Sequence, residues 1–170
     1  MTQFRAELFT ICAASGKSYA AKRLAERALR RGKGVLVFDP LRDAFPATWR
    51  TASLDALLIA AKRSRNCLII VDEALANIGL GAGEKAKFLW LATMSRHCGH
   101  QVVFICQRLR GLAPTIRDNC RTLFLFSVHK ESAEIVAEAF NDEGLKRAPS
   151  LPPYHFFYKE FFKPLKVCKF

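Results

Sequence analysis

A glycine, a lysine and a serine stand together where an apolar run gives way to a helical pattern. Gly16-Lys17-Ser18 follows the apolar stretch 8–12 and opens the segment 17–31, whose alanines and leucines recur at helical spacing. A loop in this place directs backbone amides at an anion and is backed by the positive end of a helix. The lysine would supply charge to phosphates and the serine hydroxyl suits Mg²⁺. The sequence therefore predicts a phosphate-binding loop.

This loop departs from the full Walker A spacing, Gly-x-x-x-x-Gly-Lys-Ser/Thr, because Ile11 occupies the position of the first glycine. Since Gly-Lys-Ser is a common tripeptide, a plain strand-to-helix turn is the competing interpretation. The position between an apolar strand and a helix favours phosphate binding. We expect the nucleotide to be bound by Ala13, Ala14, Ser15, Gly16, Lys17, Ser18 and Tyr19.

Two adjacent acids, Asp72 and Glu73, follow the apolar run 67–71. An aspartate at the end of a buried strand can hold the Mg²⁺ shell beside the Ser18 hydroxyl. A glutamate next to it is placed to polarise an attacking water as a general base. The competing interpretation is the solvated start of a loop. Because parallel strands bring both loops to one edge of a sheet, we predict an ATP and Mg²⁺ site, with Ser18 and Asp72 on the metal side.

Apolar strands alternate with helical segments along the chain. We expect strands at 8–12, 35–38, 67–71, 101–107 and 122–126, and helices at 17–31, 54–61, 84–96, 114–119 and 130–140. This alternation is typical of a parallel sheet covered on both faces. The prediction is an α/β, three-layer P-loop NTPase fold with a mainly parallel central sheet. We expect a single domain over 1–170, with its core at about 8–140 and an aromatic, basic C-terminal extension at 150–170.

The amino-acid composition indicates which classes of partner and which cellular location to expect. The chain has 170 residues and a net charge of +12, from 27 basic and 15 acidic residues. Such an excess favours a polyanion as partner, although solubility alone would also explain it. The longest apolar runs are too short to cross a bilayer and the N-terminus lacks a signal-peptide pattern, so we expect a soluble, intracellular protein. A metal site at His97-Cys98-Gly99-His100 is disfavoured because no second ligand cluster completes it.

Three further features follow the nucleotide motifs in order. They are a strand ending in Asp-Pro at Phe38-Asp39-Pro40, an arginine and glycine turn at 95–100, and a strand ending in Gln-Arg at 104–108, which is followed by Ile116-Arg117-Asp118-Asn119. With these, the chain from about Leu8 to Phe126 resembles the FtsK–HerA superfamily of P-loop ATPases. Within it, the sequence looks most like the genome-packaging ATPases of tailless, membrane-containing DNA viruses.

The resemblance implies an ATP-hydrolysing motor that translocates double-stranded DNA through phosphate contacts that are not sequence-specific. It implies that Gln107 is a polar sensor and that Arg96 is an arginine finger reaching a neighbouring subunit, with Arg117 as the second candidate. A plain helix-end arginine that offsets the dipole is the competing interpretation of Arg96. A finger acting in trans implies a homo-oligomeric ring, usually a hexamer in this superfamily. Such a protein would work in the host cytoplasm, with the virion vertex as a second location.

Several assignments stay open. Arg108, Arg110, Lys85 and Lys87 are candidates for DNA contact, and a solvated surface explains each equally well. We expect the first half of the segment 155–162 to form a last strand with its apolar side packed on the sheet. The tail at 161–170 alternates aromatics with lysines and could dock on a capsid or membrane-vertex protein. The alternatives are a filamentous-phage-type assembly ATPase, a P-loop nucleotide or metabolite kinase, and a nucleic-acid-binding protein without ATPase activity. Asp72-Glu73 and Gln107 favour water activation over transfer to a bound acceptor.

Overall fold

The computed structural model describes residues 6–10, 16–72, 81–106 and 113–169, with the side chains of 6–10 left out. The strands are β1 (Ala6–Thr10), β2 (Val35–Phe38), β3 (Trp49–Thr51), β4 (Leu68–Val71), β5 (Gln101–Cys106), β6 (Cys120–Leu125), β7 (His155–Glu160) and β8 (Lys166–Lys169). The helices are α1 (Lys17–Arg30), α2 (Leu54–Arg63), α3 (Ala82–Thr93), α4 (Pro114–Asn119) and α5 (Lys130–Ala139), with 3₁₀ segments η1 (Ser95–Cys98) and η3 (Glu143–Ser150).

All of these strands form one sheet in the order β3-β2-β4-β5-β1-β6-β7-β8. In this order, the first six strands, which begin with β3 and end with β6, run parallel to one another. β7 and β8 are antiparallel to their neighbours. The mainly parallel sheet predicted from the alternation of strands and helices is therefore confirmed. The tail expected as an extension continues this sheet through β7 and β8.

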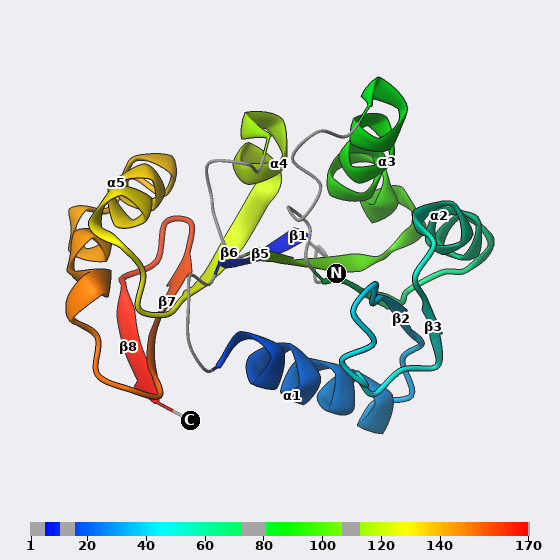
Figure 1. Cartoon of the computed structure of the whole chain (residues 1–170), viewed down its shortest axis with the longest axis horizontal. Helices are drawn as coiled ribbons and strands as arrows, with labels where there is room; N and C mark the ends of the chain where they lie inside the picture. The colour runs from blue at the N-terminus through cyan, green and yellow to red at the C-terminus, as the bar shows by residue number, and fades with distance from the viewer. Residues whose placement is uncertain (1–5, 11–15, 73–80, 107–112, 170) are drawn as a thin grey trace.

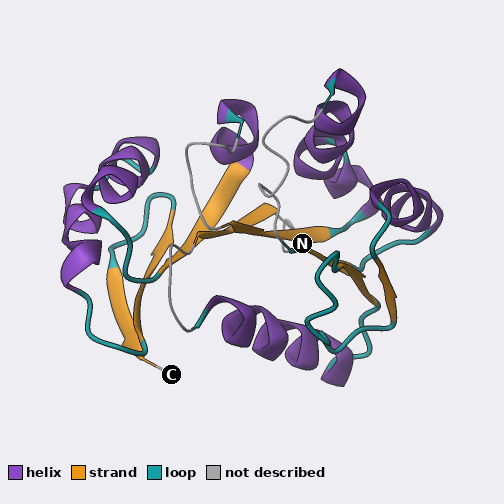
Figure 2. Ribbon diagram, in the orientation of Figure 1, coloured by secondary structure: helices purple, strands orange, loops and turns teal. Residues whose placement is uncertain are grey.

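Helices lie on both faces of the sheet, as Figure 1 and Figure 2 show. α1 covers one face, and α2, α3, α4 and α5 lie on the other. The central strands β2 and β4 are apolar throughout because both of their faces are buried: Leu36 and Phe38 belong to the core beneath α2 and α3, while Val35 and Val37 pack on the α1 side. The three layers predicted from the sequence are thus present.

Local signals fix where the helices begin and end. The Ser53 hydroxyl accepts a hydrogen bond from the Ala56 amide at 3.3 Å and caps α2. Beyond α1, Gly32 adopts a φ of +71°, a left-handed conformation that glycine takes at little cost. Both boundaries are readable in the sequence. None of the described helices combines the length and apolar character that crossing a membrane requires.

Aromatic rings cover the α1 side of the sheet where it extends past α1. Phe124 stacks on Phe156 with centroids 5.7 Å apart, Phe126 stacks on Phe156 at 5.2 Å, and Tyr158 meets the edge of Phe124 at 5.0 Å. These contacts join β6 to the antiparallel strand β7. They make the end of the sheet a continuous part of the core.

Candidate nucleotide and metal site

The sheet has two functionally different edges, set by strand direction. The carboxyl edge is formed by the ends of β2, β4, β5 and β1, and the amino edge by their starts. β5 lies between β1, which leads into the predicted phosphate loop, and β4, which leads into the predicted acids. Open parallel sheets bind ligands at the carboxyl edge. The predicted nucleotide site is therefore built on three neighbouring strands.

Gly16 begins α1 in a conformation that requires glycine. Its φ is +149°, and a Cβ built on it would lie 2.6 Å from Cε1 of Phe126. Any side chain there would be strained and would displace the Phe126 ring. The glycine of the Gly-Lys-Ser motif is thus explained by the fold itself: the backbone enters α1 directly against the end of β6.

The first turn of α1 presents the positive end of a helix of 14 residues. The Ala20 amide donates to the Gly16 carbonyl at 2.8 Å, so the regular hydrogen bonding of the helix begins at its N-cap. The first turn carries no acidic residue, and Lys17 and Ser18 are half-buried there. Backbone amides, helix dipole and lysine charge together favour an anion such as phosphate.

Asp72 follows β4 at the carboxyl edge and is only 1% exposed. Its backbone amide donates to the Phe38 carbonyl at 3.0 Å, which extends the β2–β4 pairing by one residue. The apolar residues before it are fully buried, so the chain places this carboxylate at the end of a rigid strand rather than in a solvated loop. That burial argues against the competing interpretation of Asp72 as a plain loop residue.

Asp39 is a second acid at this edge that the sequence reasoning did not assign to the site. It follows β2, is 1% exposed, and its Oδ1 accepts a hydrogen bond from the Asp43 amide at 2.8 Å. Its Oδ2 is buried, has no hydrogen bond within the described structure and forms an ion pair with Nη1 of Arg50 at 3.7 Å. A buried carboxylate oxygen without a hydrogen-bond donor is costly, so this oxygen has the capacity to accept a further partner. The signal was an apolar strand ending in an acid, the same that marked Asp72.

These residues fit a magnesium ion. The Ser18 hydroxyl, the Asp72 carboxylate and the unsatisfied Asp39 oxygen are hard oxygen ligands of the kind that Mg²⁺ prefers, directly or through its water. Among the described residues no group of three His, Cys, Asp or Glu could hold a metal ion alone. Mg²⁺ does not need such a group, because substrate phosphates and water usually complete its shell.

Several predicted site residues lie outside the described residues: Ala13, Ala14, Ser15, Glu73 and Gln107. The departure at Ile11 lies there too. The chain positions around them are nonetheless informative. Glu73 directly follows Asp72, and Gln107 directly follows Cys106 at the end of β5, the strand between β1 and β4. Their roles stay predictions.

The two candidate finger arginines lie away from the carboxyl edge. Arg96 is exposed in η1, just before β5 begins, and the half-buried Arg117 lies in α4, just before β6 begins. The six residues of β5 rise about 20 Å, which separates Arg96 from the end of the same strand. Nε of Arg117 is buried without a hydrogen bond. Arg96 therefore lies about the length of β5 away from the predicted nucleotide site of its own chain, and its role as a finger stays a prediction.

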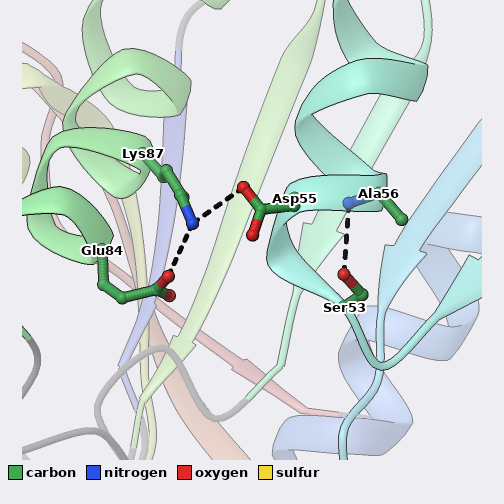
Figure 3. A network of polar contacts seen from close by, with 5 residues as sticks. All are labelled: Ser53, Asp55, Ala56, Glu84 and Lys87. Carbon is green, nitrogen blue, oxygen red and sulfur yellow. Dashed lines mark hydrogen bonds and ion pairs between the residues drawn. The ribbon is translucent and has the colours of Figure 1, made fainter.

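Lys87, a candidate for DNA contact, is held in a local network (Figure 3). Its Nζ lies 2.8 Å from Oδ1 of Asp55 on α2 and 2.6 Å from Oε1 of Glu84. The hydrogen bond with Asp55, and then that with Glu84, raises the pKa of Lys87, so it stays charged. Two carboxylates balance that charge, and Lys87 is a poor phosphate ligand. Lys85 is exposed, and Arg108 and Arg110 lie outside the described residues.

Within the His97–His100 segment, His100 has a structural role. The ring of His100 is 1% exposed; its Nδ1 accepts from the Cys67 amide at 3.1 Å, and its Nε2 lies 2.9 Å from the Ala61 carbonyl. Both ring nitrogens are used in fixing the turn into β5. His100 is therefore not available as a metal ligand.

The mainly parallel strand order, with α1 following β1 along the chain, fits a P-loop NTPase fold, and comparison with solved structures agrees. The genome-packaging NTPase B204 of Sulfolobus turreted icosahedral virus 2, in complex with AMPPCP, superposes with a TM-score of 0.77 at 15% identity over 99% of each chain. The pCW3 conjugation coupling protein TcpA, with ATPγS, gives a TM-score of 0.75 at 13% identity, over 98% of this chain and 60% of TcpA.

EssC from Geobacillus thermodenitrificans, a structure of its ATPases 2 and 3, gives a TM-score of 0.67 at 12% identity, over 96% of this chain and 39% of EssC. No protein-family model and no curated protein matches the sequence. At these identities the similarity establishes the fold. The chain therefore has the P-loop NTPase fold that its sequence predicts, and it shares that fold with these three proteins.

Proposed function

We propose that this chain is an ATP-hydrolysing motor that translocates double-stranded DNA during viral genome packaging. The observation that carries the proposal is the pairing of site and fold. A glycine-started helix with Lys17 and Ser18 shares an edge with the buried Asp72, on a fold matched over its full length by a packaging NTPase that binds an ATP analogue. TcpA and EssC share that fold and are described with ATPγS and as ATPases, respectively.

In the proposed mechanism, Lys17 and the first amides of α1 bind the β- and γ-phosphates of ATP. Ser18 and Asp72 would hold Mg²⁺, which when bound would neutralise charge on the phosphates. Glu73 accepts a proton from the attacking water, and Gln107, directly after β5, contacts the γ-phosphate between the β1 and β4 loops. Arg96 of a neighbouring subunit stabilises the charge that develops in the transition state.

This division of labour requires an assembly. Because Arg96 lies at the amino edge and the phosphate loop at the carboxyl edge, a finger contributed in trans fits a head-to-tail ring, with a hexamer as our expectation. The motor would act in the host cytoplasm and at the virion vertex. The exposed tail side chains, such as Phe162, which is 93% exposed, would contact a capsid or membrane-vertex protein.

Hydrolysis by purified protein tests the central claim. With Mg²⁺ and ATP we expect release of inorganic phosphate without an added acceptor, which also separates an ATPase from a kinase. Lys17→Ala should weaken nucleotide binding and reduce turnover at least about 100-fold, whereas Glu73→Gln should keep binding and lose turnover to a similar degree. Lys85→Ala, an exposed lysine on α3, is the control and should keep the wild-type rate. Absence of nucleotide binding at millimolar ATP would refute the proposal.

A further inference from the structure

A pocket of about 470 Å³ opens on the α1 side of the sheet, and its lining runs from Leu68 and Gln101 at the amino edge to Phe124, near the end of β6. Its floor contains the first residues of β4 and β5, Leu68 and Gln101, with the aromatic rings of Phe124 and Tyr158 beside them. Its wall is the second half of α1, which lies across the sheet (Figure 1). The pocket is thus formed by the fold and is not a crevice of one loop.

Cations gather at this pocket. Arg27, Arg31 and Lys33 line it, and none of its described lining residues is acidic. Arg27 and Arg31 stand four residues apart on one side of the helix, both exposed, and the described structure gives neither of these two arginines an ion pair. Like charges at this spacing disfavour a helix slightly, although the helix dipole offsets part of that cost.

The adjacent stripe of the same helix is arranged differently. Arg23 and Arg30 both lie near Oε2 of Glu26, at 3.3 Å and 3.8 Å, so an acid of the chain already shares their charge. The helix therefore carries two pairs of exposed arginines, and within the described structure only the pair beside the pocket lacks a carboxylate. Lys166, which pairs with Tyr158 in the sheet, is exposed beside the pocket, where Glu160, the acceptor of the Tyr158 hydroxyl, shares its charge.

We propose that this pocket is a DNA-binding site in which Arg27, Arg31 and Lys33 bind backbone phosphates and the hollow over Phe124 and Tyr158 accepts the adjoining sugar. This rests on the proposed function, since it names the surface through which the motor holds DNA. Guanidinium groups suit phosphate oxygens, and such contacts supply affinity without reading sequence. This pocket takes the place of Lys87 as the candidate for DNA contact, because Asp55 and Glu84 already balance the charge of Lys87.

The test compares matched double variants, measured without ATP by fluorescence anisotropy on a labelled 30-base-pair duplex over a series of salt concentrations. Arg27→Ala/Arg31→Ala should bind at least about 10-fold more weakly at low salt. The slope of log affinity against log salt should fall by about 2, one for each phosphate that the variant no longer neutralises. Arg23→Ala/Arg30→Ala removes the same charge from the same helix and should change both quantities by less than half as much.

The two variants should keep the wild-type melting temperature to within a few degrees and the wild-type ATPase rate without DNA. Equal losses from both variants would overturn the proposal, because net charge alone would then explain them. Loss of binding only to tripolyphosphate or to vesicles of anionic lipid, with duplex binding intact, would also overturn it. If the wild-type protein binds DNA through these arginines but hydrolyses no ATP, the DNA site stands and the proposed motor function fails.

Discussion

The two edges of the sheet carry opposite chemistry. At the carboxyl edge, Asp39 and Asp72 are each 1% exposed and the positive end of α1 begins at Gly16. At the amino edge, Arg96 is exposed and Arg27 and Arg31 flank a pocket. Buried acids and helix amides suit a metal–nucleotide complex, whereas exposed arginines suit a second macromolecule. The contrast supports our proposal that one edge binds ATP and the other meets partners, under which a complete catalytic centre would need two copies of the chain.

Among the substitutions that test the functional difference between the two edges, we expect Arg96→Ala to have the largest effect. Arg96→Ala should lower ATP turnover by about 100- to 1000-fold, because an arginine finger stabilises transition-state charge. Since Arg96 lies at the other end of the sheet from its own phosphate loop, an equal mixture with Glu73→Gln subunits should recover measurable activity. Phosphate release by the mixture is the measurement.

A matched control replaces the Glu73→Gln subunit with the double variant Arg96→Ala/Glu73→Gln, which brings no arginine and should give no rescue. Arg117→Ala in the same assay tests the second candidate. A wild-type rate for Arg96→Ala would remove it from the mechanism. The amino edge would then have no demonstrated part in hydrolysis.

The next effect concerns Gly16, which sets the start of α1 at the carboxyl edge. Gly16→Ala places a Cβ 2.6 Å from the Phe126 ring at a φ of +149°. The loop must shift, and ATP affinity should fall by about 100-fold because the amides no longer converge on one phosphate. Isothermal titration calorimetry with ATP and Mg²⁺ measures this.

Gly83→Ala is the comparison variant for Gly16→Ala. Gly83 lies in the first turn of α3, and a Cβ there meets nothing within 4 Å. Alanine should therefore stabilise the helix by up to about 1 kcal/mol and leave ATP affinity unchanged. Unaltered ATP binding by Gly16→Ala would show that the glycine does not shape the site.

Much of this arrangement is predictable from the sequence, for identifiable reasons. β2, β4 and β5 are uninterrupted apolar runs because both faces of a parallel sheet are buried, and Ser53 and Gly32 mark helix ends through local hydrogen bonding and backbone freedom. β3 and β8 were not predicted. They are short edge strands with exposed side chains, whose pairing depends on distant partners rather than on local pattern.

The residues of the candidate site likewise fall into those that the sequence predicts and those that only the structure reveals. Lys17, Ser18 and Asp72 carry local motifs and were found. Asp39 ends a strand in the same manner, but its role depends on the neighbouring strand and on the lack of a donor for Oδ2, which only tertiary structure reveals. The pocket beside Arg27 and Arg31 likewise depends on how α1 crosses the sheet, since the sequence shows only an amphipathic basic helix.

A fully paired acid provides the contrast to the unsatisfied one. Asp142 accepts from Nζ of Lys159 at 2.7 Å and from the Gly144 amide at 3.0 Å, and Lys159 is 7% exposed. The lysine hydrogen bond above all holds the pKa of Asp142 below its ordinary value of 3.8. Asp142→Asn keeps an oxygen for the Gly144 amide but leaves the lysine charge uncompensated, and should cost about 2 kcal/mol at pH 7.

The direction of the pKa shift of Asp142 determines how its contribution to stability changes with pH. Because the folded pKa of Asp142 lies below the unfolded value, its stabilisation is full above about pH 4 and is lost as the pH falls through the folded pKa. The difference in unfolding free energy between wild type and Asp142→Asn should therefore be constant near neutrality and shrink in acid. Urea denaturation at several pH values measures it. A difference that grows in acid would refute the assignment, and ATP affinity should not change.

We expect the smallest effect from substitution of Asp39, which is also the most specific test of the carboxyl edge. Its Oδ2 has no hydrogen bond in the described structure, so Asp39→Asn removes a buried charge while keeping the shape and the acceptor for the Asp43 amide. Stability should change little, because the substitution removes both the cost of burying a charge and the ion pair that this charge forms with Arg50. If the orphaned oxygen serves the water shell of Mg²⁺, the Mg²⁺ requirement for ATP binding should rise about 10-fold, as for other outer-shell partners of metals.

Asp43→Asn is the control, since Asp43 is an exposed acid four residues away that contacts Asp39 only through its amide. The readout is ATP affinity titrated against Mg²⁺, with Mn²⁺ binding followed by electron paramagnetic resonance as a measure independent of turnover. A stability loss with unchanged metal affinity would make Asp39 a partner of Arg50 alone, and the carboxyl edge would then rest on Asp72 and its neighbour. A metal effect with unchanged stability would show that the buried, unsatisfied oxygen is maintained for the ion, which is the property that separates this edge from the paired acid at Asp142.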